Sequence, residues 1–273
     1  MRNRETETDT GTAEKNEVDP RESSLFVGSI AKTFQVLEAF RDTHREMSIA
    51  EIARAAALDR SATQRIVYTL ENLRYVRRLP KSNRYALAPA VLRLSYNYLR
   101  SRQLIDRASP YLVEMTHALG ETSNLQELDG HEIVFIARVP GKYIFNPEFA
   151  VGSRLPAIYS ASGRAMLARL DPAQWAELIA ATPVAKITAQ TETDPDVLMR
   201  RIEQAAKDGF AIVQNQAVIG DISVAAPIMG HGRHPIGAIN IAVPSTRWTV
   251  GRVEAELLPH VLLASTSISE ISR

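Results

Sequence analysis

The spacing of hydrophobic positions separates a helical first third of the chain from a mixed remainder. Between residues 24 and 40, apolar side chains recur every three or four positions, a spacing that lines one face of a helix. These side chains are Ile30, Phe34, Leu37 and Phe40. Residues 1–24 contain almost no large apolar side chain, and we therefore expect them to form a disordered tail.

Two more helices are predicted before residue 75. Ser48 and Glu51 have the spacing of a capping box, which predicts a short helix beginning beside them. After a tight turn at residues 58–60, we expect Ser61 to cap the next helix, with Gln64 in the capping-box position. The stripe expected to be buried on this helix is Ile66, Leu70 and Leu73.

The hydrophobic period then changes from that of a helix to that of a strand. Residues 75–87 place apolar runs on both sides of a Pro-Lys-Ser-Asn turn, which predicts a two-stranded hairpin with a basic tip. Pro89 is expected to start a connecting helix that runs to about residue 104. After Pro110 a separate helix is expected over residues 111–119, closed by Gly120.

The pattern beyond residue 120 predicts an α+β domain. Asp129-Gly130 between two apolar runs is a strong hairpin signal, and three more strands are expected within residues 210–243. Asp171 and Asp194 each precede a proline, as at a helix N-terminus, and a last helix is expected over about 246–271. Because helices and strands do not alternate strictly, the sheet is expected to be antiparallel or mixed.

Basic residues gather on the predicted third helix and hairpin. The whole chain has a formal net charge of +1, yet residues 60–84 contain seven basic residues and one acidic residue. Helix, short helix, turn, helix and basic hairpin are, in this order, the elements of a winged helix-turn-helix, whose second motif helix enters the major groove. A solvated face on a helical bundle would explain the charge but neither the spacing nor the hairpin.

The residues expected to contact double-stranded DNA lie on the solvent face of that helix and on the hairpin. Thr and Gln side chains suit hydrogen bonds to base edges, and Arg suits guanine or phosphate. The hairpin tip would lie against the phosphate backbone or enter the minor groove. The predicted contacts are Arg60, Ser61, Thr63, Gln64, Arg65, Tyr68, Lys81 and Arg84.

Catalytic and metal sites are poorly supported, and we expect no enzyme activity, metal or cofactor. The chain has no cysteine, which excludes thiol catalysis and Cys-ligated metals. Residues 160–164 lack the glycine-flanked serine of a hydrolase, and His231 and His234 lie in a polar loop. With no secretory signal and no long apolar run, we expect a cytoplasmic, nucleoid-associated protein without membrane contact.

Polar residues of the second domain favour a sensor of small molecules. They are expected to converge where a helix N-terminus, which attracts anions, meets a concave sheet. An enzyme with a basic docking surface, or a DNA-binding protein whose second domain only oligomerises, remain as alternatives. The converging residues are Ser160, Ser162, Asp221, Ser223 and Asn240.

Several segments together resemble the IclR family of bacterial transcription regulators, from about Leu25 to the C-terminus. They are the helical head, ETSNLQELDGHEIVFIARV, VGSRLPAIYSASGRAMLA, GFAIVQNQAVIG and GAINIAV. The resemblance implies a winged helix-turn-helix, a linker helix used in dimerisation and a GAF-like α/β effector domain. It also implies homodimers or homotetramers on pseudo-palindromic operators. The expected boundaries are 1–24 for the tail, 25–88 for the winged helix-turn-helix domain, 89–105 for the linker helix and 106–273 for the domain that binds the effector and oligomerises.

The resemblance also implies where an effector binds, between the sheet and the helix that follows the L-P-A run. The SRLPA form is similar to the branch responding to protocatechuate and p-hydroxybenzoate, so the expected effector is a small aromatic or organic acid and the expected targets are catabolic genes. Asp221 departs from the family pattern, which is commonly apolar here, and would suit a hydroxyl or amine donor. The implied ligand-binding residues are Ser160, Ala161, Ser162, Gly163, Val213, Gln214, Asp221, Ser223 and Asn240.

Overall fold

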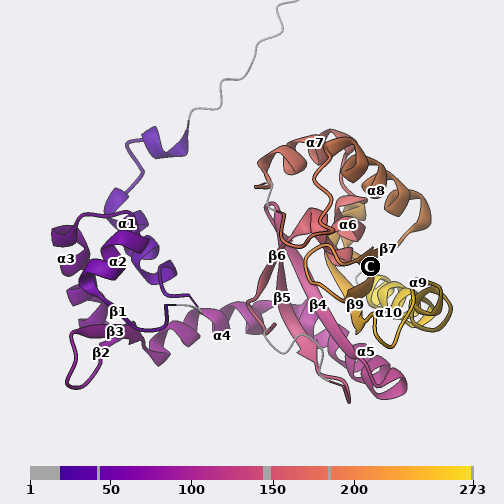
Figure 1. Ribbon diagram of the computed structural model, residues 1–273, viewed down its shortest axis with the longest axis horizontal. Coiled ribbons are helices and arrows are strands. Elements are labelled where there is room, and N and C mark those ends of the chain that lie inside the picture. The colour runs from indigo at the N-terminus through magenta and orange to yellow at the C-terminus, as the bar shows by residue number, and fades with distance from the viewer. Residues whose placement is uncertain (1–18, 42–43, 144–148, 184–185, 272–273) are drawn as a thin grey trace, which may run out of the picture. The chain divides into compact units, whose positions relative to one another are not determined.

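The computed structural model describes residues 19–41, 44–143, 149–183 and 186–271. The chain divides between Asn97 and Tyr98 into two compact units, each with its own hydrophobic interior (Figure 1). Of the expected tail, residues 1–18 lie outside the described residues, and Pro20–Glu22 form one turn of 3-10 helix.

The described part of the first unit is built around three α-helices and a small antiparallel sheet. In chain order these are α1 (Gly28–Glu38), β1 (Met47–Ser48), α2 (Ile49–Ala55), α3 (Arg60–Asn72), β2 (Val76–Arg78) and β3 (Arg84–Leu87). The strand order β1-β3-β2 makes β2 and β3 the expected wing beside the helix-turn-helix. The core between helices and sheet includes Val36, Met47, Ile52, Val67, Leu70 and Val76.

The helix caps of this unit partly follow the prediction. The capping box of α2 is confirmed, because the Ser48 hydroxyl accepts from the Glu51 N–H and the Glu51 carboxylate accepts from the Ser48 N–H. The prediction that Ser61 caps α3 is wrong: Asp59 is the N-cap, and its carboxylate accepts from the Ala62 N–H at 2.8 Å. Asp59 has the extended backbone of an N-cap, so Arg60 already begins the helix.

The buried faces of α1 and α3 also differ from the prediction. Leu73 is 56% exposed because α3 ends at Asn72, and Val67 is buried on the stripe instead. On α1 the buried residue is Val36, while Ile30 and Phe34 are 55% and 50% exposed. The first turns of α1 therefore present apolar side chains to solvent.

A helix break at Arg102 replaces the break expected at Pro110. Pro89–Val91 form a 3-10 turn that leads into α4 (Leu92–Ser101), and α5 then runs over Gln103–Leu119. Pro110 lies inside α5, where it removes one backbone hydrogen bond. The helix continues because its apolar face packs on the sheet of the second unit, through Leu104, Ala108, Leu112 and Met115. Gly120 closes α5 in the left-handed conformation, as predicted.

The second unit is built on a six-stranded sheet in which every neighbouring pair is antiparallel. The strand order is β6-β5-β4-β9-β8-β7, and the Asp129-Gly130 hairpin between β4 and β5 is confirmed. The strands are β4 (Thr122–Asp129), β5 (Glu132–Val139), β6 (Arg154–Pro156), β7 (Ala211–Gln214), β8 (Asp221–Met229) and β9 (Pro235–Pro244).

Helices cover both faces of this sheet (Figure 1). One face packs against α5, α9 (Val250–Arg252), a π-helical turn at Val253–Leu257 and α10 (Leu258–Ile271). The other face packs against α6 (Ala161–Leu167), α7 (Pro172–Ala181) and α8 (Pro195–Asp208). Asp171 and Asp194 cap α7 and α8 as predicted, and the α+β fold class is confirmed.

Candidate functional sites

The solvent face of α3 carries most of the residues predicted to contact DNA. Arg60, Ser61, Gln64, Arg65 and Tyr68 are all exposed. The expectation for Thr63 is wrong: this residue is fully buried, and its hydroxyl donates to the Asp59 carbonyl at 2.8 Å. Thr63 shares the inner stripe of α3 with Val67 and Leu70, because these positions are four and seven residues apart.

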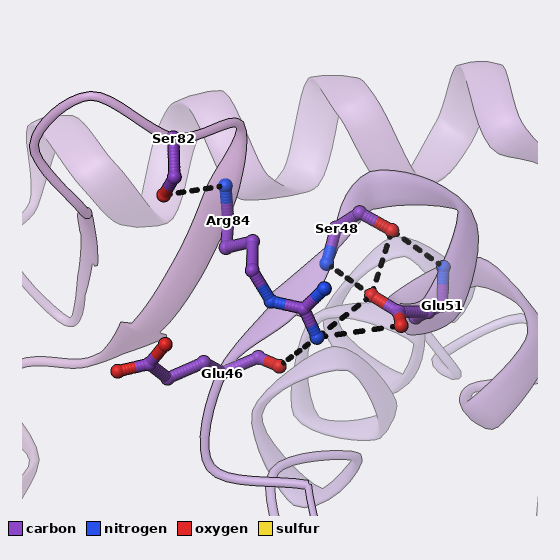
Figure 2. A network of polar contacts seen from close by, with 5 residues as sticks. All are labelled: Glu46, Ser48, Glu51, Ser82 and Arg84. Carbon is purple, nitrogen blue, oxygen red and sulfur yellow. Dashed lines mark hydrogen bonds and ion pairs between the residues drawn. The ribbon is translucent and has the colours of Figure 1, made fainter.

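The two predicted wing residues have different surroundings. Lys81 is exposed at the hairpin turn. Arg84, at the start of β3, instead reaches the first turn of α2 (Figure 2): its guanidinium donates to the Glu46 carbonyl at 2.6 Å and lies 3.2 Å from a Glu51 carboxylate oxygen. Arg84 follows the hairpin turn as predicted, but its side chain ties the start of β3 to the capping box of α2.

A cavity in the second unit lies between the sheet and the segment that leads into α6. It contains about 520 Å³ of atom-free space, part of which is open to solvent. Seven of the nine predicted ligand-binding residues line it. They are Ser160, Ala161, Ser162, Val213, Asp221, Ser223 and Asn240.

Asn240 is the centre of the hydrogen-bond network in this cavity. Its carbonyl oxygen accepts from the Asn124 amide at 2.8 Å and from the Gln126 amide at 3.0 Å. Its own amide donates to the Ser223 hydroxyl at 2.7 Å. Ile239 and Ile241 pack in the core on the opposite face, so strand alternation points Asn240 into the cavity.

The L-P-A run and the start of α6 are held mainly by structural contacts. The Ser160 hydroxyl accepts from the Gly163 N–H at 3.0 Å. This N–H is therefore not available to an anion, contrary to the expectation that the helix N-terminus binds one. Ser162 donates to the Gln126 side-chain oxygen at 2.8 Å. Gly163 lies outside the cavity lining, and a Cβ there would overlap the backbone of Ala157. The prediction that Gly163 contacts ligand is therefore replaced by a packing role.

Gln214 is the second predicted ligand residue that lies outside the cavity. Successive residues of a strand point to opposite faces, so Val213 lines the cavity while Gln214 is exposed on the other side. Gln214 instead borders a separate hollow beside α8. The placement of Gln214 in the ligand site is therefore wrong.

Aromatic and cationic side chains complete the cavity. The rings of Phe135 and Phe149 stack with centroids 5.4 Å apart and planes at 8°. Arg138, on β5, donates to the Asn124 side-chain oxygen at 3.0 Å. The cavity thus combines an apolar aromatic wall with a guanidinium and several amides and hydroxyls.

Two polar atoms at the cavity are buried without a hydrogen-bond partner among the described residues: the Asp221 oxygen Oδ1 and the Tyr159 hydroxyl. Burial raises the pKa of Asp221 to about 7. Burial likewise raises the pKa of the Tyr159 hydroxyl above its ordinary value. Each group lacks the interaction that would normally offset its burial.

Sequence reasoning missed the contribution of β4 and β5 to the cavity. One signal was present: β4 carries an unusual number of polar residues, and Thr122, Asn124 and Gln126 occupy alternate positions in it. Side chains at alternate positions of a strand lie on one face of the sheet, and here this is the face that also carries Asn240. Arg138 and Phe149 carried no comparable signal in the pattern.

Neither a metal site nor a membrane-spanning helix is found within the described ranges of the chain. There, no cluster of His, Asp and Glu side chains has the arrangement needed to hold a metal ion. Over the same residues, no helix combines the length and the apolar character needed to cross a membrane.

An exposed recognition helix with a wing, joined to a domain that holds a polar cavity, defines a DNA-binding regulator that responds to a small molecule. The chain belongs to the IclR family. The IclR helix-turn-helix domain matches residues 29–80, and the C-terminal domain of bacterial transcriptional regulator IclR matches residues 96–270. The protein is thus a transcription regulator and not an enzyme.

Relatives with known names support this assignment over most of their length. The Pca regulon regulatory protein of Pseudomonas putida is 31% identical, and the match covers 89% of this chain and 83% of that protein. The transcriptional repressor IclR of Escherichia coli is 28% identical, covering 83% and 84%.

Solved structures share the same fold. The IclR of Thermotoga maritima has a TM-score of 0.69 at 26% identity, covering 89% of this chain and 98% of that one. An IclR homologue of Microbacterium hydrocarbonoxydans, solved with 4-hydroxybenzoate, has a TM-score of 0.74 at 23% identity, covering 89% and 98%. At that identity the second likeness supports the fold alone.

Proposed function

We propose that this regulator controls catabolic genes in response to a small organic acid, most simply an aromatic one, bound in the cavity of the second unit. The observation that carries the proposal is the cavity itself, in which Arg138 and the amides of Asn124 and Asn240 face a wall formed by Phe135 and Phe149. A guanidinium suits a carboxylate, and an aromatic wall suits a flat ring.

The printed names of the relatives indicate which acids to test first. One is named for the Pca regulon, another for the acetate operon, and the Microbacterium hydrocarbonoxydans homologue was solved with 4-hydroxybenzoate. These are statements about those proteins. For this chain they supply the first compounds to be tested.

The proposed DNA contacts are the exposed residues of α3 and the wing tip. Side chains at the start of a recognition helix contact base edges, and the wing contacts phosphates. Arg84 contributes by holding the wing. The contact set proposed is Arg60, Ser61, Gln64, Arg65, Tyr68 and Lys81.

Homo-oligomers on a pseudo-palindromic operator are the proposed working form, in the cytoplasm and on the nucleoid. Exposed apolar residues on α1 and on α4 support this, because monomers rarely leave such side chains in groups. They include Ile30 at 55%, Phe34 at 50%, Leu92 at 64% and Leu94 at 52% exposure. Two heads of a dimer would contact half-sites about one helical turn apart.

The test is calorimetric titration of the full chain with benzoate, 4-hydroxybenzoate, protocatechuate and acetate, beside the variant Asn240→Ala. At least one acid should bind the parent chain and change its affinity for DNA selected from a random library. Asn240→Ala should lose this binding, whereas Gln214→Ala, outside the cavity, should keep it. Failure of every acid to bind would refute acid sensing, and equal binding to Asn240→Ala would refute the cavity.

A further inference from the structure

Buried polar atoms without partners are rare in folded proteins, because each costs free energy that a hydrogen bond would recover. Among the described residues there are four side-chain atoms of this kind, and two of them, on Tyr159 and Asp221, belong to one cavity. The other two, on Arg107 and Arg164, lie outside its lining. Unpaired groups in a cavity indicate what a ligand must supply.

Several polar side chains of the cavity already satisfy one another. Asn240 bonds to Asn124, Gln126 and Ser223, and Gln126 also accepts from Ser162. These side chains form a connected and preorganised network. Among the described residues of the lining, Asp221 Oδ1 and the Tyr159 hydroxyl are the buried side-chain atoms without a partner.

The location of Asp221 explains why its carboxyl is unpaired. It is the first residue of β8 and shares the cavity face with Ser223, two positions further along the strand. Beside it in the lining are the apolar side chains of Ala217 and Val218, from the segment before the strand. Burial alone raises its pKa to about 7, with no cationic side chain of the described chain contributing.

We propose that Asp221 is a specificity-determining residue that selects effectors carrying a hydrogen-bond donor, a hydroxyl or amino group, in addition to their carboxylate. This rests on the proposed function. A donor would satisfy Asp221 Oδ1, whereas an unsubstituted acid would leave it unpaired. A second carboxylate on the ligand would be repelled by the ionised form of Asp221.

Tyr159 provides the second unpaired group, from the 3-10 turn Ala157–Tyr159 that precedes α6. A hydroxyl on the ligand can donate one hydrogen bond and accept another. An aromatic hydroxy acid therefore matches the cavity better than a dicarboxylate of similar size does.

The experiment compares affinities of the full chain for matched acids by calorimetry at one pH above the pKa of Asp221, which is about 7. The probes are benzoate, 3- and 4-hydroxybenzoate, 4-aminobenzoate and terephthalate. At least one hydroxy- or amino-substituted acid should bind about 10- to 100-fold more tightly than benzoate, as expected for a hydrogen bond to a charged group. Terephthalate should bind more weakly than benzoate.

Asp221→Leu should abolish the preference, so that the hydroxy- and amino-substituted acids bind no more tightly than benzoate does. Asp221→Asn, which keeps an acceptor but no charge, should retain a few-fold preference and remains available if the leucine variant fails to fold. Gln214→Leu is the matched control outside the cavity and should keep the full preference. A residue with a purely structural role would change all affinities together and leave their ratio unaltered.

The outcomes separate the two proposals. If benzoate and all substituted acids bind the parent chain equally, or if both Asp221 variants keep the full ratio, Asp221 does not select the effector. The organic-acid function would survive that result. If none of the probes binds, acid sensing itself is wrong and the role of Asp221 is rejected with it.

Discussion

At the scale of single residues, Glu127 and Asp221 are two shielded carboxyl groups in opposite surroundings. Glu127 accepts from the Arg102 guanidinium at 2.8 Å and also from the Tyr98 hydroxyl. Asp221 Oδ1 has no partner among the described residues. Glu127 is therefore held by two hydrogen-bond donors, whereas burial without a partner for Oδ1 raises the pKa of Asp221.

Asp221 should make the second unit less stable as the pH rises. Its pKa is about 7 when folded and roughly 3.9 when unfolded, so the folded chain binds more protons between these values. The free energy of unfolding should therefore fall between pH 4 and pH 7. Above pH 7 the contribution of Asp221 should not change further. Asp221→Asn should be more stable than the parent by on the order of 2–4 kcal/mol at pH 8, and by less at pH 5.

Urea unfolding followed by tryptophan fluorescence measures this difference. Both tryptophans of the chain, Trp175 and Trp248, belong to the second unit, so the signal reports on that unit. Among the described residues, Arg138 and Tyr159 are the other ionisable side chains lining the cavity, and both are kept in the variant. A stability difference that is the same at pH 5 and pH 8 would contradict burial of an unpaired carboxyl.

Glu127→Gln should lower the stability of the second unit by about 1–3 kcal/mol, because hydrogen bonds to a charged acceptor become neutral ones. Glu127 is 5% exposed, so solvent cannot replace the lost interactions. Glu114→Gln, an exposed site on α5, is the matched control and should change stability by less than about 0.5 kcal/mol. Equal effects of the two substitutions in urea unfolding would show that the Arg102 and Tyr98 contacts contribute nothing.

At the scale of elements, two residues at the N-terminus of α3 have different roles: Asp59 caps the helix, and Ser61 is a proposed DNA contact. Asp59→Ala should destabilise the first unit by about 0.5–2 kcal/mol, because it removes the acceptor of the Ala62 N–H. Ser61→Ala should leave stability nearly unchanged, since Asp59 already caps the helix. Thermal unfolding followed by circular dichroism measures both. If Ser61→Ala loses stability and Asp59→Ala does not, Ser61 is the N-cap, as the sequence predicted.

The recognition helix and the wing should respond differently to loss of a cation. Arg65→Ala should weaken binding to the selected DNA sequence by about 1–3 kcal/mol, with a smaller effect on random DNA. Lys81→Ala should weaken both alike and lower the salt slope by about one. Lys207→Ala, an exposed cation of α8, should change neither. Identical losses for Arg65→Ala on both DNAs would argue against base contact.

At the scale of the whole molecule, the exposed apolar residues of α1 bear on assembly. If they support a dimer, Ile30→Glu should weaken self-association in sedimentation experiments and reduce a two-half-site footprint to weak single-site binding. Affinity should fall steeply, because one head neutralises only part of the phosphates. Gln35→Glu, also exposed on α1, adds the same charge outside this group and should remain dimeric. An Ile30→Glu dimer of parental affinity would exclude α1 from the interface.

Local rules predicted much of this fold. The capping box at Ser48, the N-caps at Asp171 and Asp194 and the closing Gly120 depend on residues only a few positions apart, and all are observed. Local rules failed where packing opposed them. Pro110 lies within α5 because burial of that helix's apolar face outweighs one missing hydrogen bond.

The sequence by itself determined the class of protein, because helix spacing, clustered basic residues and strand alternation are local properties. Alternation alone placed Asn240 opposite Ile239 and Ile241. Tertiary structure alone decided which groups find partners. Arg84 bonds to Glu51, which lies 33 positions away in the sequence. Asp221 Oδ1, by contrast, has no hydrogen-bond partner among the described residues. Such pairings depend on contacts between distant segments, which no periodicity along the chain records.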